Sequence, residues 1–530
     1  MSSASTLIYG SPILMGDNTI PGLEIPREIK AAIPHIFKVC KDFGLDYYET
    51  IVEFLTYDDI SEIAAYGGFP VRYPHWSFGM EYEELSKGYE YGQHRIFEMV
   101  INTNPCYLYC LDSNTYTDNV TVIAHALGHC DFFKNNLWFH PTSQNMMNEF
   151  GNHRSRIMRY MQRWGKEQVG SFIDLCLSLE TLIDPASAWT VKKYKEPVTQ
   201  DHREYQFPRR LKVESQHDYM ESWINKNDFR EQEVERIKAE ELRKDLGIFE
   251  DKTKNIMGFM RDYAPLKAWQ QDVLAMLYEE AMYFQPQRLT KMANEGWASY
   301  IDYNVMARIG MPDCGIFEYA DHKARVLGGK QSQNPYKLGF ELFLYIEDKW
   351  NKGRFGDEYE QCEDNQIKEK WDKKLGLGHE KVFEVRANYN DAMMLAEFFD
   401  QEFCDKYEFY EWKKFPSNEP GVESEYKIVS RDAKRIKKLL MQRYLNGGLP
   451  DIRLVDHNGR GKGIMVWEHQ WEGRTLLPKY TTEVIKNASK LWGRPVVLIT
   501  KNKNEEEIIY YAQPDQDAVK ALKPKQYQEL

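Results

Sequence analysis

Apolar residues recur at helical spacing through most of the chain. The pattern predicts helices over residues 26–65, 118–185, 265–284 and 292–306, and a further helix after Pro335. Residues 97–114 differ, because their β-branched and aromatic side chains are typical of strands and end in a turn signal. We therefore expect a main body that is mostly helical, with a small amount of sheet.

The C-terminal part has a different pattern of apolar and turn-forming residues. Its segment LPDIRLVDHNGRGKGIMVWEHQW predicts a hairpin, with strands at Ile452–Val455 and Gly463–Trp467 and a turn at Asn458–Gly459. The helix TTEVIKNASKLWG and the strands PVVLITKN and EIIYYAQ follow. The predicted fold class is α+β and predominantly helical: a main domain over residues 20–380, then a smaller α+β module over 381–530. The module carries no recognisable chemistry and should mediate interaction or stabilise the main domain.

Residues 190–258 form a charged stretch with two prolines. Acidic and basic residues interleave at helical spacing in REQEVERIKAEELRKD, which is typical of a solvated helix. Little apolar surface is available there for burial. We predict a surface insertion in the main domain rather than a catalytic part.

Composition restricts the class of protein. Aromatic residues make up 14% of the chain, with 13 tryptophans, as in a well-packed globular protein. The net charge of −12 argues against nucleic-acid binding by bulk electrostatics. The eight cysteines include no C-x-x-C pair and favour a reducing compartment. The sequence offers no apolar run long enough to span a membrane, so we expect a cytoplasmic protein.

The main chemical signal is a pair of histidines, His125 and His129, in TVIAHALGHCDFFKNN. Residues four apart lie on one face of a helix, so both imidazoles can point at one metal ion. Zincins use this geometry in H-E-x-x-H, where the glutamate is the general base. Here position 126 is Ala, so that base is missing. Gly128 should allow another backbone or a ligand to approach closely.

A carboxylate in NEGWASY completes the predicted site. Glu295 stands among apolar and aromatic residues, where an unpaired charge would be costly. A salt bridge to an Arg or Lys is the alternative, but a metal shared with His125 and His129 explains the pattern better. The predicted metal is zinc, in a zincin-like helical domain.

The proton acceptor must come from elsewhere in the chain. Glu149 is the first choice, because it pairs with His153 at helical spacing and can return on an antiparallel helix. Asp131 and Glu81 are weaker candidates. A two-metal site that adds Glu149, His153 and Glu180 is a further alternative, although the helical E-x-x-H pattern of di-iron sites is absent from these segments.

Two residues are candidates for donating a hydrogen bond to a developing oxyanion: Tyr300 and His322. A third histidine, His75, lies in the aromatic segment GGFPVRYPHWSFGMEYEEL, which has too many glycines and prolines to be one helix. We interpret His75 as a packing residue, with a substrate contact as the alternative.

Several long blocks resemble one family. HALGHCDFFKNN, NEGWASY, YFQPQRLTKM and NPYKLGF (Asn334–Phe340) are similar to the stage V sporulation protein R (SpoVR) family, and the resemblance extends from about residue 20 to about residue 510. It implies a cytoplasmic bacterial protein linked to spore cortex formation. The family's biochemical activity is not established, so the resemblance does not choose between functions.

Two functions fit the sequence. The first is a zincin-like metal-dependent hydrolase that acts on a peptide or peptidoglycan-related bond, in which zinc polarises a carbonyl and activates water. The second is a non-catalytic scaffold for sporulation proteins, with a structural metal or none, and the alanine at position 126 favours it. Neither function involves nucleic acid or a membrane span.

Overall fold

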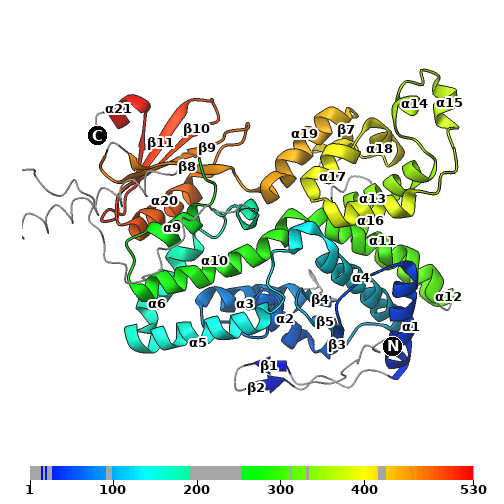
Figure 1. The fold of residues 1–530 in the computed structure, drawn as a ribbon, viewed down its shortest axis with the longest axis horizontal. Coiled ribbons are helices and arrows are strands. Elements are labelled where there is room, and N and C mark those ends of the chain that lie inside the picture. The colour runs from blue at the N-terminus through cyan, green and yellow to red at the C-terminus, as the bar shows by residue number, and fades with distance from the viewer. Residues whose placement is uncertain are drawn as a thin grey trace, which may run out of the picture. The chain divides into compact units, whose positions relative to one another are not determined.

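The structure is a computed structural model, and its labelled elements are shown in Figure 1. It describes residues 13–15, 18–20, 27–90, 98–189, 252–310, 313–329, 334–415, 425–459 and 461–528. The chain forms two compact units. The first contains Met1–Thr181 and Leu266–Pro450, and the second contains Leu182–Pro265 and Asp451–Leu530. Most of the predicted insertion at 190–258 lies outside the described residues.

The predicted border at residues 380–381 falls inside the first unit. Val382 and Leu395 belong to the same hydrophobic core as the helices before residue 380. Asp391 accepts hydrogen bonds from the backbone N–H groups of Met292 (2.9 Å) and Ala293 (2.8 Å), at the start of a central helix. The division therefore follows Pro450, because the intervening helices bury their apolar faces in the first unit.

The fold is α+β and predominantly helical, as predicted. The helices of the first unit are α1 (Arg27–Phe43), α2 (Tyr57–Ala65), α3 (Trp76–Glu90), α4 (Tyr116–Asn135), α5 (Met146–Trp164), α6 (Lys166–Leu177), α10 (Ala268–Leu289), α11 (Lys291–Ile309), α12 (Asp313–Leu327), α13 (Pro335–Asn351), α14 (Asp357–Glu360), α15 (Asn365–Glu369), α16 (Gly378–Asn388), α17 (Asp391–Phe398), α18 (Gln401–Lys406) and α19 (Ala433–Tyr444). Among the described helices, none combines the length and apolar character needed to cross a bilayer.

The first unit also contains a three-stranded sheet in the order β3-β5-β4. Strand β5 (Cys106–Leu111) pairs in parallel with β3 (Thr50–Leu55) and antiparallel with β4 (Glu98–Ile101). Two-stranded ribbons are formed by β1 (Ile13–Met15) with β2 (Asn18–Ile20), and by β6 (Glu411–Phe415) with β7 (Glu425–Ser430).

One local prediction was wrong. Residues 50–55, expected to be helical, form β3, and all six are buried. Their β-branched and aromatic side chains suit a strand. The strand that pairs with them lies some 50 residues later in the chain, so the local spacing of apolar residues did not reveal the sheet. The segment around His75 is not one helix, as predicted: it is irregular up to His75, and helix α3 begins at Trp76. Its prolines all precede the helix, where they do not interrupt it.

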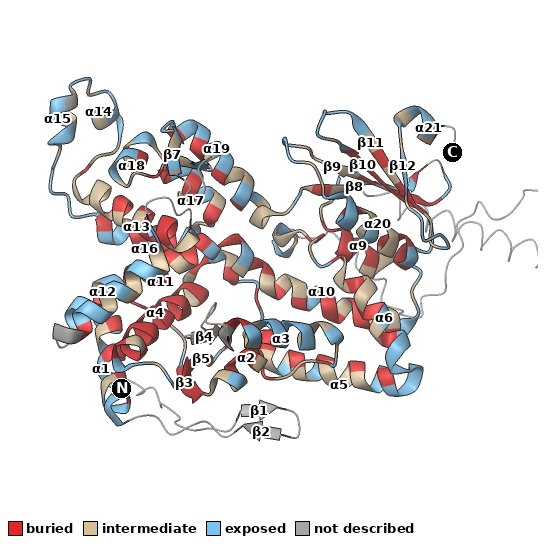
Figure 2. Ribbon diagram, turned by 180° about the vertical axis from the view of Figure 1, so that it is seen from behind, coloured by how far each residue is buried: buried red, intermediate tan, exposed pale blue. Residues whose placement is uncertain are grey.

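Helix α4 is the central element of the first unit. A capping box between Thr115 and Asp118 starts it, and every residue from Asn119 to Phe133 is buried (Figure 2). The expected role of Gly128 is confirmed, because a Cβ atom there would lie 2.9 Å from the Cα of Ala298 on α11. Without side-chain bulk at this crossing, α4 and α11 can pack closely.

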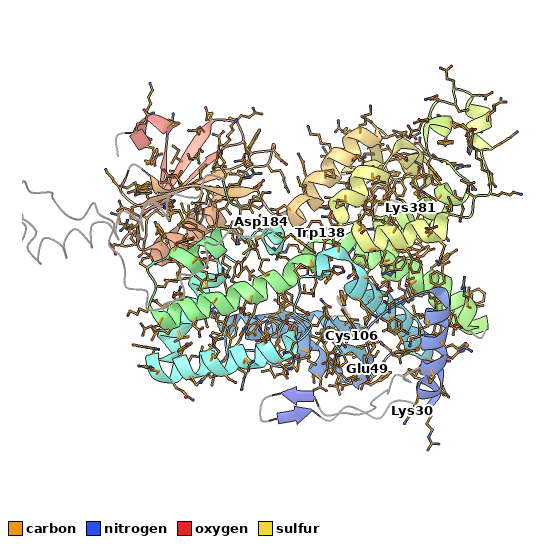
Figure 3. All side chains as sticks on the ribbon, viewed as in Figure 1. Lys30, Glu49, Cys106, Trp138, Asp184 and Lys381 are labelled. Atoms are coloured by element: carbon orange, nitrogen blue, oxygen red, sulfur yellow. The ribbon has the colours of Figure 1, made fainter. Side chains whose placement is uncertain are left out.

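Outer helices complete this core. On α1, Ile29 and Ile33 are buried, whereas Lys30 projects away from the helix (Figure 3). Gly296 of α11 packs directly on Gly339 of α13, where added Cβ atoms would meet backbone. Helix α11 is thus held between α4 and α13, and this fixes the direction of its polar residues.

The second unit holds a five-stranded sheet in the order β12-β11-β10-β9-β8. The predicted hairpin is confirmed as β8 (Ile452–Gly459) and β9 (Ile464–His469), which are antiparallel. The predicted helix is α20 (Pro478–Trp492), and it connects β9 to the parallel strand β10 (Val496–Lys501). The remaining elements are β11 (Glu507–Ala512), β12 (Lys520–Leu522), α9 (Ile256–Tyr263) and α21 (Pro524–Gln528).

Candidate metal centre

The two histidines of α4 converge on one carboxylate of α11. The Nε2 atoms of His125 and His129 lie 3.7 Å and 3.5 Å from Oε2 of Glu295. Their ring centroids are 4.8 Å apart, and both side chains are about nine-tenths buried. The sequence placed these three residues in one site, and the structure brings them together.

The Nδ1 atom of each imidazole forms a hydrogen bond with a side chain of α11. His125 donates from Nδ1 to Oδ2 of Asp302 at 2.9 Å, and His129 donates from Nδ1 to Oδ1 of Asn294 at 2.9 Å. These hydrogen bonds fix the ring orientation, so both Nε2 atoms are directed toward Glu295. Histidines that bind metal ions are held in this way.

Asp302 is anchored in turn by α12. Its carboxylate accepts hydrogen bonds from Lys323 Nζ at 2.6 and 2.8 Å and from the Tyr319 hydroxyl at 2.7 Å. Lys323 also donates to the backbone carbonyl of Ser299 at 3.0 Å. The carboxylate that orients His125 therefore has little freedom to move.

A second carboxylate reaches the site from the sheet. Oε1 of Glu98, on β4, lies 3.7 Å from Nε2 of His125. Ligand atoms of Glu98, His125 and His129 all lie within 4.8 Å of one another. Glu98 Oε2 is buried and has no hydrogen-bond partner among the described residues. Glu295, by contrast, accepts a hydrogen bond from the Tyr336 hydroxyl of α13.

The charges of this cluster favour a cation. Burial would lower the pKa of His125, but Glu98, Asp302 and Glu295 outweigh it and raise that pKa to about 10. Burial, together with the charges of Glu295 and Asp302, raises the pKa of Glu98 to about 7, although His125 acts to lower it. Burial lowers the pKa of His129. Three largely buried carboxylates thus surround two imidazoles and the Lys323 ammonium group, and a proton or a metal ion can balance the negative charge that remains in excess.

Three residues predicted to act in catalysis lie in different places. Glu149 is on α5, next to Phe150, which belongs to a separate hydrophobic cluster with Tyr283. Among the described residues, no hydrogen bond or ion pair joins Glu149 to the histidine cluster. Its helix neighbour His153 pairs instead with Glu280 at 2.9 Å.

Tyr300 and His322 have contrasting positions. Tyr300 follows Glu295 by five residues, which turns it about 140° around the helix. Its ring stacks on Trp297 in the hydrophobic core, away from the histidines. His322 of α12 lies at the edge of the cluster, where Nδ1 is 3.4 Å from Oδ1 of Asp118, and its charge lowers the pKa of Glu98.

Several residues of the cluster were missed. Asp302 follows Glu295 by seven residues, two helical turns, so the sequence did contain a signal for it. Asn294 directly precedes Glu295, so its position in the sequence was also a signal for it. Glu98 and Lys323 could not be found in this way, because only the packing of β4 and α12 against α4 brings them to the histidines.

Comparison with known proteins supports a family assignment. No solved structure matches the chain. The uncharacterized protein YcgB of Escherichia coli (strain K12) is 25% identical over 495 residues, which cover 89% of this chain and 91% of that protein. The family model described as "SpoVR like protein" matches residues 24–449, a span that ends at the border of the first unit and includes every residue of the histidine cluster. The chain belongs to the SpoVR family.

Proposed function

We propose that this protein is a metal-dependent hydrolase whose zinc ion is bound by His125, His129 and Glu295. One observation carries the proposal: both Nε2 atoms face one carboxylate, while both Nδ1 atoms are held by Asp302 and Asn294. A buried histidine pair that served only for packing would not need this arrangement on both sides.

The donor set fits zinc. Two imidazoles and a carboxylate are the protein ligands of many catalytic zinc sites, which leave one position open. When bound, zinc would supply a Lewis acid that polarises a carbonyl and activates water. The likeness to zincins in this proposal is limited to the helical histidine pair and the later glutamate.

In this proposal Glu98 is the proton acceptor, the role that the sequence analysis predicted for Glu149. Position 126 is Ala, and Glu98 is the carboxylate that approaches the histidines from the other side, with Oε2 unpartnered. From β4 it can accept a proton from water next to the His125 and His129 imidazoles. Glu149 and Tyr300 have no part in this proposal, because their surroundings are separate from the cluster.

His322 remains the candidate donor to a developing oxyanion, since it lies beside Glu98 at the edge of the cluster. A peptide or peptidoglycan-related bond is the proposed target. The proposed substrate class rests on the SpoVR resemblance, and a cytoplasmic location rests on that resemblance and on the composition of the chain.

A scaffold with a structural metal is the second candidate. The observation that favours it is Ala126, since helix α4 lacks the usual glutamate. In that case Glu98 would be a fourth ligand, and the site would be closed, as structural zinc sites are. The two candidates differ in what Glu98 does, so this residue discriminates between them.

Elemental analysis of the purified full-length protein tests the metal site. We expect about one zinc ion per chain, and its loss in His129→Ala and Glu295→Gln. The control is His153→Gln, which alters a buried histidine outside the cluster and should keep the metal. Well under one metal ion per chain in the unaltered protein, prepared without chelator in zinc-replete medium, would refute the site.

Glu98→Gln then separates the hydrolase from the scaffold. For the hydrolase, this variant keeps the metal but loses cleavage of a mixed peptide library or of purified muropeptides, followed by mass spectrometry. Loss of the metal in Glu98→Gln would show that Glu98 is a ligand, and the proposed proton transfer would then fail. Metal without cleavage in the unaltered protein would favour the scaffold.

A further inference from the structure

A separate cleft in the first unit is built like a ligand site. It has a volume of about 1090 Å³, comparable to the larger small-molecule pockets of proteins. The wall is formed by the end of α2, the segment between α2 and α3, the start of α3, α5, and the first residue of α6. No member of the histidine cluster lines this cleft.

An arginine with unused hydrogen-bonding capacity lies in the wall. The Arg72 guanidinium is buried, with 7% of its side chain exposed, and pairs through Nη2 with Glu280 at 2.7 Å. Glu280 in turn accepts a hydrogen bond from His153 at 2.9 Å, so its charge is shared between two cationic groups. Arg72 Nε and the hydroxyl of the adjoining Tyr73 are buried without hydrogen-bond partners among the described residues. Buried polar atoms of this kind are normally satisfied, and a ligand would satisfy them.

An exposed tryptophan stands over the same cleft. Trp76 is 66% exposed, yet its indole N–H donates to Asp174 at 2.8 Å. His75 holds the same carboxylate at 3.1 Å and packs against the indole, with ring centroids 5.5 Å apart. The buried His75 thus acts as a packing residue that fixes Trp76. A fixed aromatic face open to solvent is suited to stacking against a ring, because little conformational entropy is lost on binding.

Two cations complete the lining. Arg154 and Lys166 have no carboxylate within 4.0 Å among the residues that the structure describes. The lining contains one carboxylate, Glu62. Arg154 lies near enough to Tyr66 to lower that residue's pKa, although burial and Glu62 raise it more. Within the described part of the chain, the cleft therefore offers unpaired positive charge next to aromatic faces, in a protein whose net charge is −12.

We propose that this cleft binds a small molecule that joins a ring to a phosphate or carboxylate group. The ring stacks on Trp76, and the anion is held by Arg154 and Lys166 and by the free donors of Arg72 and Tyr73. Arginine suits this task because its planar fork matches the oxygens of both anions. A nucleotide and a sugar phosphate share the required chemistry.

Isothermal titration of the full-length protein tests the proposal with three probes: ADP, glucose 6-phosphate and inorganic phosphate. At least one ring-bearing probe should bind about tenfold or more tightly than inorganic phosphate. ADP binding alone would identify a base-stacking site, and glucose 6-phosphate binding alone would identify a sugar site.

Matched variants locate the binding. Trp76→Ala and Arg154→Ala should each weaken it about tenfold or more, whereas Arg159→Ala, an exposed position on the same helix as Arg154, should leave it unchanged. Metal content should stay at the unaltered level in all three variants, which separates this site from the histidine cluster. Absence of binding, equal affinity for inorganic phosphate, or binding that survives both substitutions would overturn the proposal.

Discussion

The support of His125 by Asp302 gives the sharpest prediction, made with Asp302→Asn. The replacement keeps the shape and one acceptor oxygen but removes the negative charge. In the folded protein that charge serves His125 at 2.9 Å, Lys323 at 2.6 and 2.8 Å, and Tyr319 at 2.7 Å. An asparagine cannot accept all of these hydrogen bonds.

The loss of metal affinity has two sources. Removing the partner that orients a ligating histidine typically weakens metal binding 10- to 100-fold, or about 1.4 to 2.8 kcal/mol. Lys323, whose side chain is only 12% exposed, would also keep its charge near the cluster without its paired carboxylate; the acceptors left to it would be the asparagine oxygen and the Ser299 carbonyl at 3.0 Å. That ammonium repels a cation, so we expect a value toward the upper end of the range.

The assay is competition for zinc against a chromophoric chelator, with the dissociation constant measured for each variant. Adding Lys323→Met to Asp302→Asn should recover part of the affinity, because it removes the uncompensated charge. Asp321→Asn on α12 alters an exposed carboxylate paired with Arg325 and should have no effect. If Asp302→Asn binds zinc as tightly as the unaltered protein, Asp302 does not support a metal ligand and the reasoning is refuted.

Three further predictions concern the rest of the first unit. Gly128→Ala should lower stability by about 1–3 kcal/mol in denaturant unfolding, because its Cβ would lie 2.9 Å from the backbone of Ala298, whereas Gly151→Ala, with open space around it, should be neutral or stabilising. Burial lowers the pKa of His153, but Glu279 and Glu280 outweigh it and raise that pKa to about 9. Its contribution to stability is therefore complete below pH 6.5 and lost as pH rises through 9, so the difference in melting temperature between the unaltered protein and His153→Gln should shrink over this interval, and a constant difference would contradict it. Removing the metal with a chelator should lower the melting temperature, and restoring zinc should raise it in proportion to the logarithm of zinc concentration; no shift in either direction would mean that the folded state does not bind zinc.

Local signals predicted a large part of this protein. The spacing of His125 and His129 is a property of one helix, and so is the place of Glu295 on another. The hairpin of β8 and β9 and the helix after Pro335 were likewise predicted from neighbouring residues, although Asn458 and Gly459 end strand β8 and the turn follows them. Such features depend on hydrogen bonds and side-chain directions within a few residues, so the sequence determined them by itself.

Tertiary structure decided the remainder. Strand β3 exists because it pairs with β5, more than fifty residues later in the chain. Glu98 reaches the histidines because β4 packs beside α4, and Glu149 does not because α5 packs elsewhere. The spacing of residues along a helix cannot show which of these two carboxylates lies beside the histidines. The choice depends on which distant elements bury their apolar faces together, and only the folded chain specifies those contacts.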